Sequence, residues 1–234
     1  MPVGALLGGL LAAYYVASDD LADVALAWDV AFLSLALIPA MLLLVYLALP
    51  FALDLEPRIL VLAVVGLASA PVALELADLE IAANFFKFAA VTTAGWWFLE
   101  FFEAVTWVVL IALLIIPVDI FSVARGPTKE ILENEPRVFD VLSVFFPIPG
   151  EQPLAQLGLP DVLFFALFLG ATVRFGLRVR WTWLVMALSF GATLLIAVVL
   201  DVGGLPALPL LSLAFVLVNG DLLWKNVRGR RSSG

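Results

Sequence analysis

Two aspartates lie at the edges of long apolar segments, where an ionisable group costs about 2.5–3.5 kcal/mol at the centre of a membrane span and so needs a reason. Asp119 ends an otherwise uncharged run, and Asp161 begins the next run after a polar stretch at 122–160. One run leads into that stretch and the other leads out of it. If both are membrane helices, the two carboxylates lie at a similar depth and can face each other.

Such a pair has a definite chemistry, because two close carboxylates cannot both ionise cheaply and therefore share one proton. The charged member activates a water and the protonated member donates to the scissile carbonyl, as in aspartic proteases. A structural alternative exists for Asp161, because an acid in the first turn of a helix is favourable to its dipole and Pro160 suits the same turn. Asp119 lies near a helix C-terminal end, where an acid opposes the dipole, so it favours a functional interpretation.

The composition excludes several other kinds of site. The chain has no cysteine and no histidine, which excludes disulfides, thiolate nucleophiles, Cys/His zinc sites and a Ser-His-Asp relay. We therefore expect no metal and no cofactor. The excess of acidic over basic residues (20 against 12) argues against nucleic acid as a partner. An acidic, cysteine-free chain with more Arg than Lys is also typical of salt-loving archaea.

The chain is too apolar for a soluble domain, since 64% of its 234 residues are hydrophobic and only 14% are charged. We expect an integral protein of the lipid bilayer with an all-α fold, a polytopic bundle of about eight transmembrane helices. The predicted spans are roughly 3–17, 28–50, 58–77, 81–99, 104–121, 161–175, 182–201 and 205–223.

Three regions follow from this pattern. Residues 1–103 are predicted to be a scaffold of transmembrane helices, 104–223 to carry the chemistry, and 224–234 to be a basic tail. The stretch 122–160 is rich in proline and is predicted to be a connecting loop.

Basic residues predict the orientation, because cytoplasmic loops collect Lys and Arg. Their distribution places both termini in the cytoplasm of a multi-pass cell-membrane protein, with the 122–160 loop outside. Lys87 lies within a span, where we expect a structural salt bridge with an acid.

Three motifs in order resemble the presenilin and signal peptide peptidase family of intramembrane aspartyl proteases. Val118-Asp119 followed by Arg125-Gly126-Pro127 is similar to the Tyr-Asp segment, and Gly158-Leu159-Pro160-Asp161 is similar to Gly-x-Gly-Asp. Pro206-Ala207-Leu208 matches the Pro-Ala-Leu motif that begins the last helix. The resemblance covers residues 104–223.

The resemblance implies a presenilin-like fold in which Asp119 and Asp161 are the catalytic pair. It implies that the substrate is a transmembrane helix, and that an active-site wall holds this helix after local unwinding. Stretch 122–160 would offer a strand edge and a lateral gate. With the predicted orientation, the substrates are type II membrane segments or leftover signal peptides. The residues expected to contact substrate are Gly158, Leu159, Pro160, Pro206, Ala207 and Leu208.

Two departures from the family motifs leave alternatives open. The Tyr before the first Asp is replaced by Val118, and the second Gly of Gly-x-Gly-Asp by Pro160. These changes motivate a second hypothesis, a presenilin-fold membrane protein without protease activity. A third hypothesis is an ion-coupled transporter in which Asp119, Asp161 and Lys87 form a relay. The oligomeric state is left open.

Overall fold

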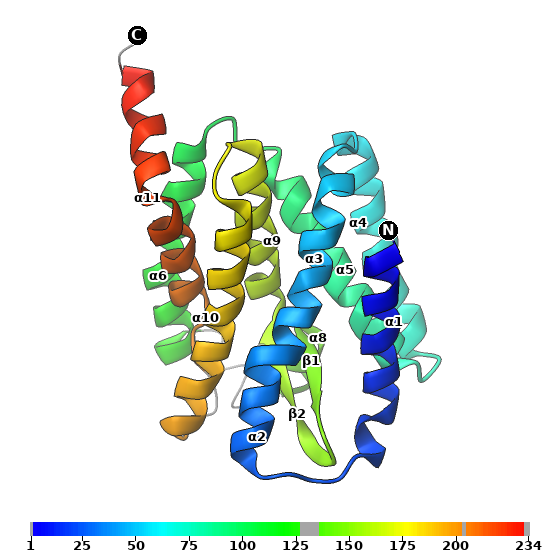
Figure 1. Cartoon of the computed structure of the whole chain (residues 1–234). Coiled ribbons are helices and arrows are strands. Elements are labelled where there is room, and N and C mark those ends of the chain that lie inside the picture. The colour runs from blue at the N-terminus through cyan, green and yellow to red at the C-terminus, as the bar shows by residue number, and fades with distance from the viewer. Residues whose placement is uncertain (1, 127–135, 203–204, 232–234) are drawn as a thin grey trace.

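The computed structural model describes residues 2–126, 136–202 and 205–231 as a helical bundle with one small β-hairpin (Figure 1). A 3-10 turn, η1 (Ser18–Asp20), follows the first helix, and a π-helical segment, η2 (Leu33–Leu37), joins α2 to α3 without a break. The strands are β1 (Ser143–Ile148) and β2 (Glu151–Gly158). The helices are α1 (Pro2–Ala17), α2 (Leu26–Phe32), α3 (Ile38–Leu53), α4 (Pro57–Glu75), α5 (Glu80–Leu99), α6 (Val105–Arg125), α8 (Pro136–Val141), α9 (Leu159–Arg174), α10 (Val179–Val199) and α11 (Leu208–Arg231).

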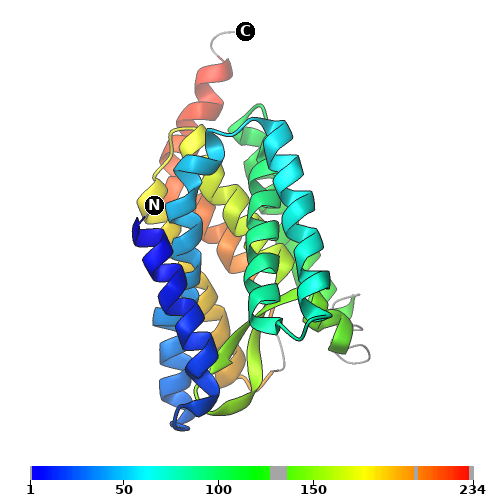
Figure 2. The same cartoon turned by 90° about the vertical axis from the view of Figure 1, so that its right-hand side faces the viewer.

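Every range predicted to span the membrane contains a helix. Within the described residues, five helical segments are long and apolar enough to cross a bilayer: Leu26–Leu53, Pro57–Glu75, Val105–Arg125, Val179–Val199 and Leu208–Asn226. The chain is therefore a mostly helical membrane protein, and the count of eight spans stays a prediction. The beginning of α1 and the end of α11 both lie toward the end of the bundle opposite the hairpin (Figures 1 and 2).

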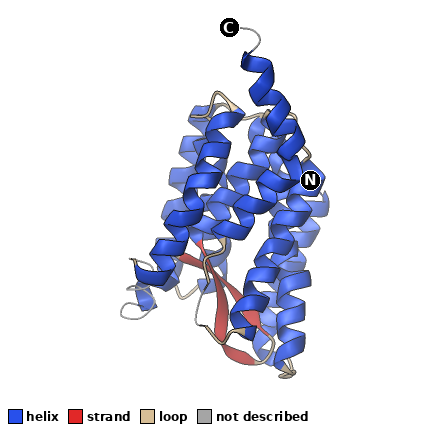
Figure 3. Cartoon of the chain, turned by 90° about the vertical axis from the view of Figure 1, so that its left-hand side faces the viewer, coloured by secondary structure: helices blue, strands red, loops and turns tan. Residues whose placement is uncertain are grey.

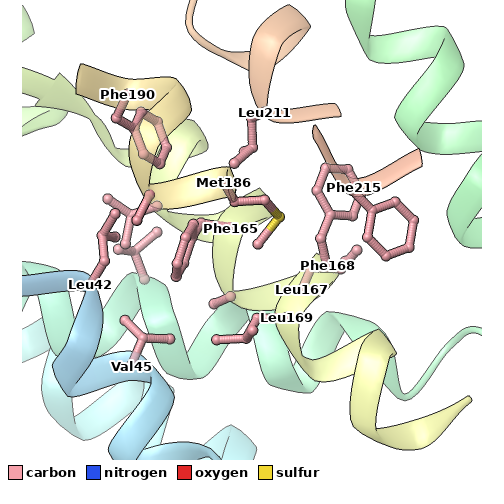
Figure 4. Packing of buried hydrophobic residues seen from close by; sticks show 14 of the residues in the cluster. Leu42, Val45, Phe165, Leu167, Phe168, Leu169, Met186, Phe190, Leu211 and Phe215 are labelled. Carbon is pink, nitrogen blue, oxygen red and sulfur yellow. The ribbon is translucent and has the colours of Figure 1, made fainter. Parts of the chain in front are cut away.

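Helix α9 is the central element of the bundle. Its residues Phe165 to Leu169 have no exposed surface, because α5 packs on one side and α3, α6, α10 and α11 approach from the others. Figure 4 shows these side chains meeting those of α3, α10 and α11, and the rings of Phe168 and Phe215 stack with centroids 4.9 Å apart. A helix that is apolar all round is one buried among other helices. The two predicted regions 1–103 and 104–223 therefore share one core.

Glycines allow two of these helix contacts to be close. A Cβ at Gly95 in α5 would lie 2.5 Å from the carbonyl oxygen of Leu163 in α9. A Cβ at Gly191 in α10 would lie 2.8 Å from the carbonyl oxygen of Ser34, in the π-helical segment η2. Small residues at such crossings let the two backbones approach closely. The resulting van der Waals contacts stabilise the helix pair in lipid, where the hydrophobic effect contributes little.

The chain is mostly helical, as predicted, but the described part of 122–160 is not a plain connecting loop, because it contains α8 and an antiparallel two-stranded hairpin (Figure 3). Pro149 and Gly150 form the two-residue turn, and Gly150 has the positive φ (+68°) that a type II turn requires. Pro147 lies at the register irregularity between Phe146 and Ile148, where a missing N–H is tolerated.

Other boundaries differ from those predicted at either side of this stretch. Helix α6 continues through Arg125, four residues beyond the predicted span, and α11 continues through Arg231 into the predicted tail. Pro127 of the Arg-Gly-Pro element and residues 232–234 lie outside the described residues. The predicted ion pair of Lys87 is confirmed: its Nζ lies 3.6 Å from Glu75 Oε1 and donates to the Asp140 carbonyl at 3.1 Å.

Candidate active site

The two aspartates identified from the sequence line one cavity of about 540 Å³ beside the hairpin. Asp119 comes from the last two turns of α6, and Asp161 from the first turn of α9. The segment before α11 and the last part of α10 complete the wall, with β2 and α8 on the remaining side. Both carboxylate-bearing residues are half-buried, and they are close enough to interact electrostatically.

Asp119 is positioned by the start of α11. Its Oδ2 accepts a hydrogen bond from the backbone N–H of Leu208 at 3.2 Å. The first N–H groups of a helix have no partner inside that helix, and the positive end of its dipole attracts an anion. An acid that is unfavourable near the end of its own helix is therefore stabilised by the beginning of another.

Asp161 is positioned by its own helix. Gly158 is the N-cap residue of α9, and its backbone N–H donates to the Asp161 carboxylate three residues later. This is one half of a capping box. A Cβ at Gly158 would lie 3.1 Å from Asp161 Oδ2, so the glycine lets the strand-to-helix turn lie directly against the carboxylate.

Most residues expected to contact substrate lie on the wall of this cavity, namely Gly158, Pro160, Pro206, Ala207 and Leu208. Leu159 does not. It packs against the hydrophobic core, and its N–H donates to the Leu142 carbonyl at 2.9 Å.

The two departures from the family motifs have different surroundings. The side chain of Val118 is 63% exposed and does not line the cavity, so it faces outward from the bundle. Pro160 does line it and occupies the first turn of α9, where a missing N–H costs no helical hydrogen bond.

Among the described residues, the two outer edges of the hairpin differ in how they are covered. The outer edge of β1 is occupied by side chains. Asn84 of α5 donates to the Phe145 carbonyl at 3.0 Å and accepts from the Phe145 N–H at 2.9 Å, while Tyr15 donates to the same carbonyl at 2.8 Å. Tyr14 donates to the Pro147 carbonyl at 2.8 Å.

The register of the hairpin then shows which groups of β2 point outward. In an antiparallel pair, opposed residues alternately exchange hydrogen bonds and direct them away from each other. Because Phe145 directs its N–H and C=O outward, so does its partner Gln156. Within the described part of the chain, no strand pairs with this outer edge of β2. Gln156 lies two residues before Gly158, and both line the cavity.

Asp29 is a buried carboxylate that was not predicted from the sequence. Asp29, in α2, is 1% exposed, and neither of its oxygens has a hydrogen-bond partner among the described residues. The signal that could have identified it is its place in the sequence, because an acid one residue inside the predicted span 28–50 is costly unless it is solvated or paired. Asp29 does not line the cavity of Asp119 and Asp161.

The structure gives less support to a relay through Lys87 or to a metal site. Lys87 is held by Glu75 and the Asp140 carbonyl and does not line the cavity, so it is not brought together with the two aspartates. Among the described residues, no three acidic side chains gather in a way that could hold a metal ion.

Comparisons with known proteins add no family assignment. No family model, no curated protein and no solved structure matches the chain. Its function is therefore inferred from Asp119, Asp161 and the cavity that they share.

Proposed function

We propose that the protein is an intramembrane aspartyl endopeptidase of the presenilin and signal peptide peptidase type, which hydrolyses peptide bonds within transmembrane segments. The observation that carries the proposal is the meeting of Asp119 and Asp161, 42 positions apart, in one cavity lined by apolar side chains. The free edge of β2 beside them supplies a surface on which an extended substrate can lie.

The reaction needs one proton shared by the pair. The ionised carboxylate takes a proton from a water molecule, whose oxygen attacks the scissile carbonyl carbon, while the protonated carboxyl donates to the carbonyl oxygen. The tetrahedral intermediate then collapses: one of its hydroxyl groups returns its proton to the ionised carboxylate, the C–N bond breaks, and the leaving nitrogen takes a proton from the protonated carboxyl. One water is consumed, and the pair returns to its starting state with one proton.

The substrate must be extended at the point of attack, because a helix encloses its carbonyl groups. In a membrane, the freed backbone groups need new partners. The outward N–H and C=O of Gln156 are placed to pair with an extended segment, and Gly158 continues the same strand to the side chain of Asp161. Strand addition at β2 would therefore bring a substrate carbonyl to the pair.

A second candidate function rests on the same hydrogen bonds. The carboxylates of Asp119 and Asp161 each accept a backbone N–H at the start of a helix, which is a structural task sufficient to explain a buried acid. In that case the protein is a presenilin-fold membrane protein without protease activity, and the departure at Pro160 on the cavity wall fits this alternative.

The experiment is a cleavage assay with the full chain in detergent or in vesicles. The reporters are a type II and a type I single-span segment, with a soluble unfolded protein as the control. The proposal predicts cleavage inside a membrane segment, with fragment masses that add up to the reporter plus one water. With both termini in the cytoplasm, the type II reporter is the one cut. Failure with every reporter across pH and salt series would leave the non-catalytic alternative.

A further inference from the structure

A second cavity, of about 490 Å³, lies at the end of the bundle away from the hairpin (Figure 1). It is formed where α3 ends, where α9 passes into α10, and where α10 begins. None of its lining residues belongs to the cavity of the two aspartates. The lining residues are Tyr46, Leu49, Pro50, Val173, Arg178, Val179, Arg180 and Trp181.

The wall and the rim of this cavity differ in character. Leu49, Pro50 and Val173 give it apolar sides, and Val173 is 45% exposed, so the cavity opens at the outer surface of the helices. Apolar sides at the outside of a membrane bundle suit a hydrocarbon chain.

The rim carries polar groups with unused binding capacity. Arg180 is exposed and makes no ion pair with any described residue. The Tyr46 hydroxyl has no hydrogen-bond partner in the described part of the chain, and its ring packs against Trp183 with centroids 5.9 Å apart. Trp181 is 63% exposed, as is usual for tryptophans at the boundary between hydrocarbon and headgroups.

Arg178, by contrast, is already neutralised. Its Nη1 and Nη2 donate to Asp221 at 2.5 and 2.8 Å, and Nη1 also donates to the Val218 carbonyl at 2.7 Å. Arg178 therefore forms a fixed edge of the cavity, and Arg180 is the lining residue whose positive charge is available to a ligand.

We propose that this cavity binds one anionic phospholipid, with the phosphate on the Arg180 guanidinium and the Tyr46 hydroxyl and an acyl chain along Leu49, Pro50 and Val173. A basic pocket between membrane helices at the cytoplasmic surface is the setting in which anionic headgroups are recognised. The apolar walls select a lipid over a free anion, and the unpaired positive charge selects an anionic lipid over a zwitterionic one. The site is independent of the proposed protease activity.

The test is native mass spectrometry of the full chain in detergent, titrated with phosphatidylglycerol, with phosphatidylcholine of the same acyl chains, and with inorganic phosphate. We expect one phosphatidylglycerol to be retained more tightly than the rest. Arg180→Gln removes a charge-assisted hydrogen bond to the phosphate and should therefore weaken the binding of this lipid by at least about tenfold. Tyr46→Phe should weaken it by less.

Arg58→Gln is the matched control, because Arg58 is exposed at the same end of the bundle, lies in the first turn of α4 and does not line the cavity. It removes the same charge and should leave the tight lipid in place. Melting temperatures in detergent verify that all variants are folded. Equal loss of lipid in Arg180→Gln and Arg58→Gln, equal retention of phosphatidylcholine, or displacement of phosphatidylglycerol by millimolar phosphate would each overturn the proposal.

Discussion

The carboxylate of Asp119 accepts the backbone N–H of Leu208, 89 positions later in the chain, at 3.2 Å. This hydrogen bond joins the end of α6 to the beginning of α11 and explains why a Pro-Ala-Leu element and an aspartate so distant in sequence belong to one site. It also keeps one carboxylate oxygen occupied, which leaves the other oxygen of Asp119 to act on a water or a substrate in the cavity.

Substitution of Gly158 tests the fit between the strand end and the second aspartate. The backbone of Gly158 (φ −60°, ψ 142°) is open to any residue, so Gly158→Ala acts through the contact of its Cβ, 3.1 Å from Asp161 Oδ2. We expect about a tenfold fall in the cleavage rate from the displaced carboxylate, with an unchanged melting temperature.

Gly66→Ala in α4 is the control for this substitution, because a Cβ there meets nothing within 4 Å. Its cleavage rate should equal that of the native chain. Equal rates for native protein and Gly158→Ala would show that the position of Asp161 does not limit the reaction.

Asn84 is expected to hold the hairpin in place. Asn84→Ala leaves the buried N–H of Phe145 without its acceptor, which costs about 1–3 kcal/mol. Tyr15→Phe is the comparison, since it removes one of two donors to the Phe145 carbonyl and leaves that carbonyl bonded to Asn84.

Thermal unfolding in detergent should therefore give a clearly lower midpoint for Asn84→Ala than for Tyr15→Phe. The cleavage rate should fall further in Asn84→Ala, because β2 loses its fixed neighbour. A midpoint for Asn84→Ala at or above that of Tyr15→Phe contradicts this account of the hairpin.

The pH dependence of cleavage should be bell-shaped. At low pH both carboxyls are protonated and no base is present, and at high pH both are ionised and no acid is present. Rates measured from acidic to alkaline pH, with melting temperatures taken at each value, separate this effect from unfolding. A rate that rises with pH to a plateau would indicate one titrating group and exclude a pair with one shared proton.

The helices could be predicted from the sequence because each is a long apolar run, and the cost of burying Lys87 predicted its ion pair with an acid. The hairpin could not, because its strands are short, include Pro147 and Pro153, and depend on side chains of α1 and α5 that lie more than 60 positions away. The prolines that predicted a plain loop include Pro149, which forms the turn of the hairpin together with Gly150.

Part of the candidate site could also be predicted from the apolar runs. Asp119 and Asp161 were recognisable because acids at the ends of apolar runs are costly, and their meeting followed from the direction of the two helices. The outward side chain of Val118, the inward packing of Leu159 and the buried carboxylate of Asp29 depend on the rotation of each helix about its axis, which apolar runs with little periodicity do not specify.

The most direct measurement compares cleavage by the native chain with that by Asp119→Asn and Asp161→Asn. Asparagine accepts a backbone N–H almost as well as aspartate at a helix start, so both variants should keep the hydrogen bonds to Leu208 and Gly158 and melt near the native temperature. Since neither asparagine can exchange a proton, the account predicts loss of cleavage by at least about a thousandfold in each variant. Folded variants that cut the type II reporter at the native rate would contradict it.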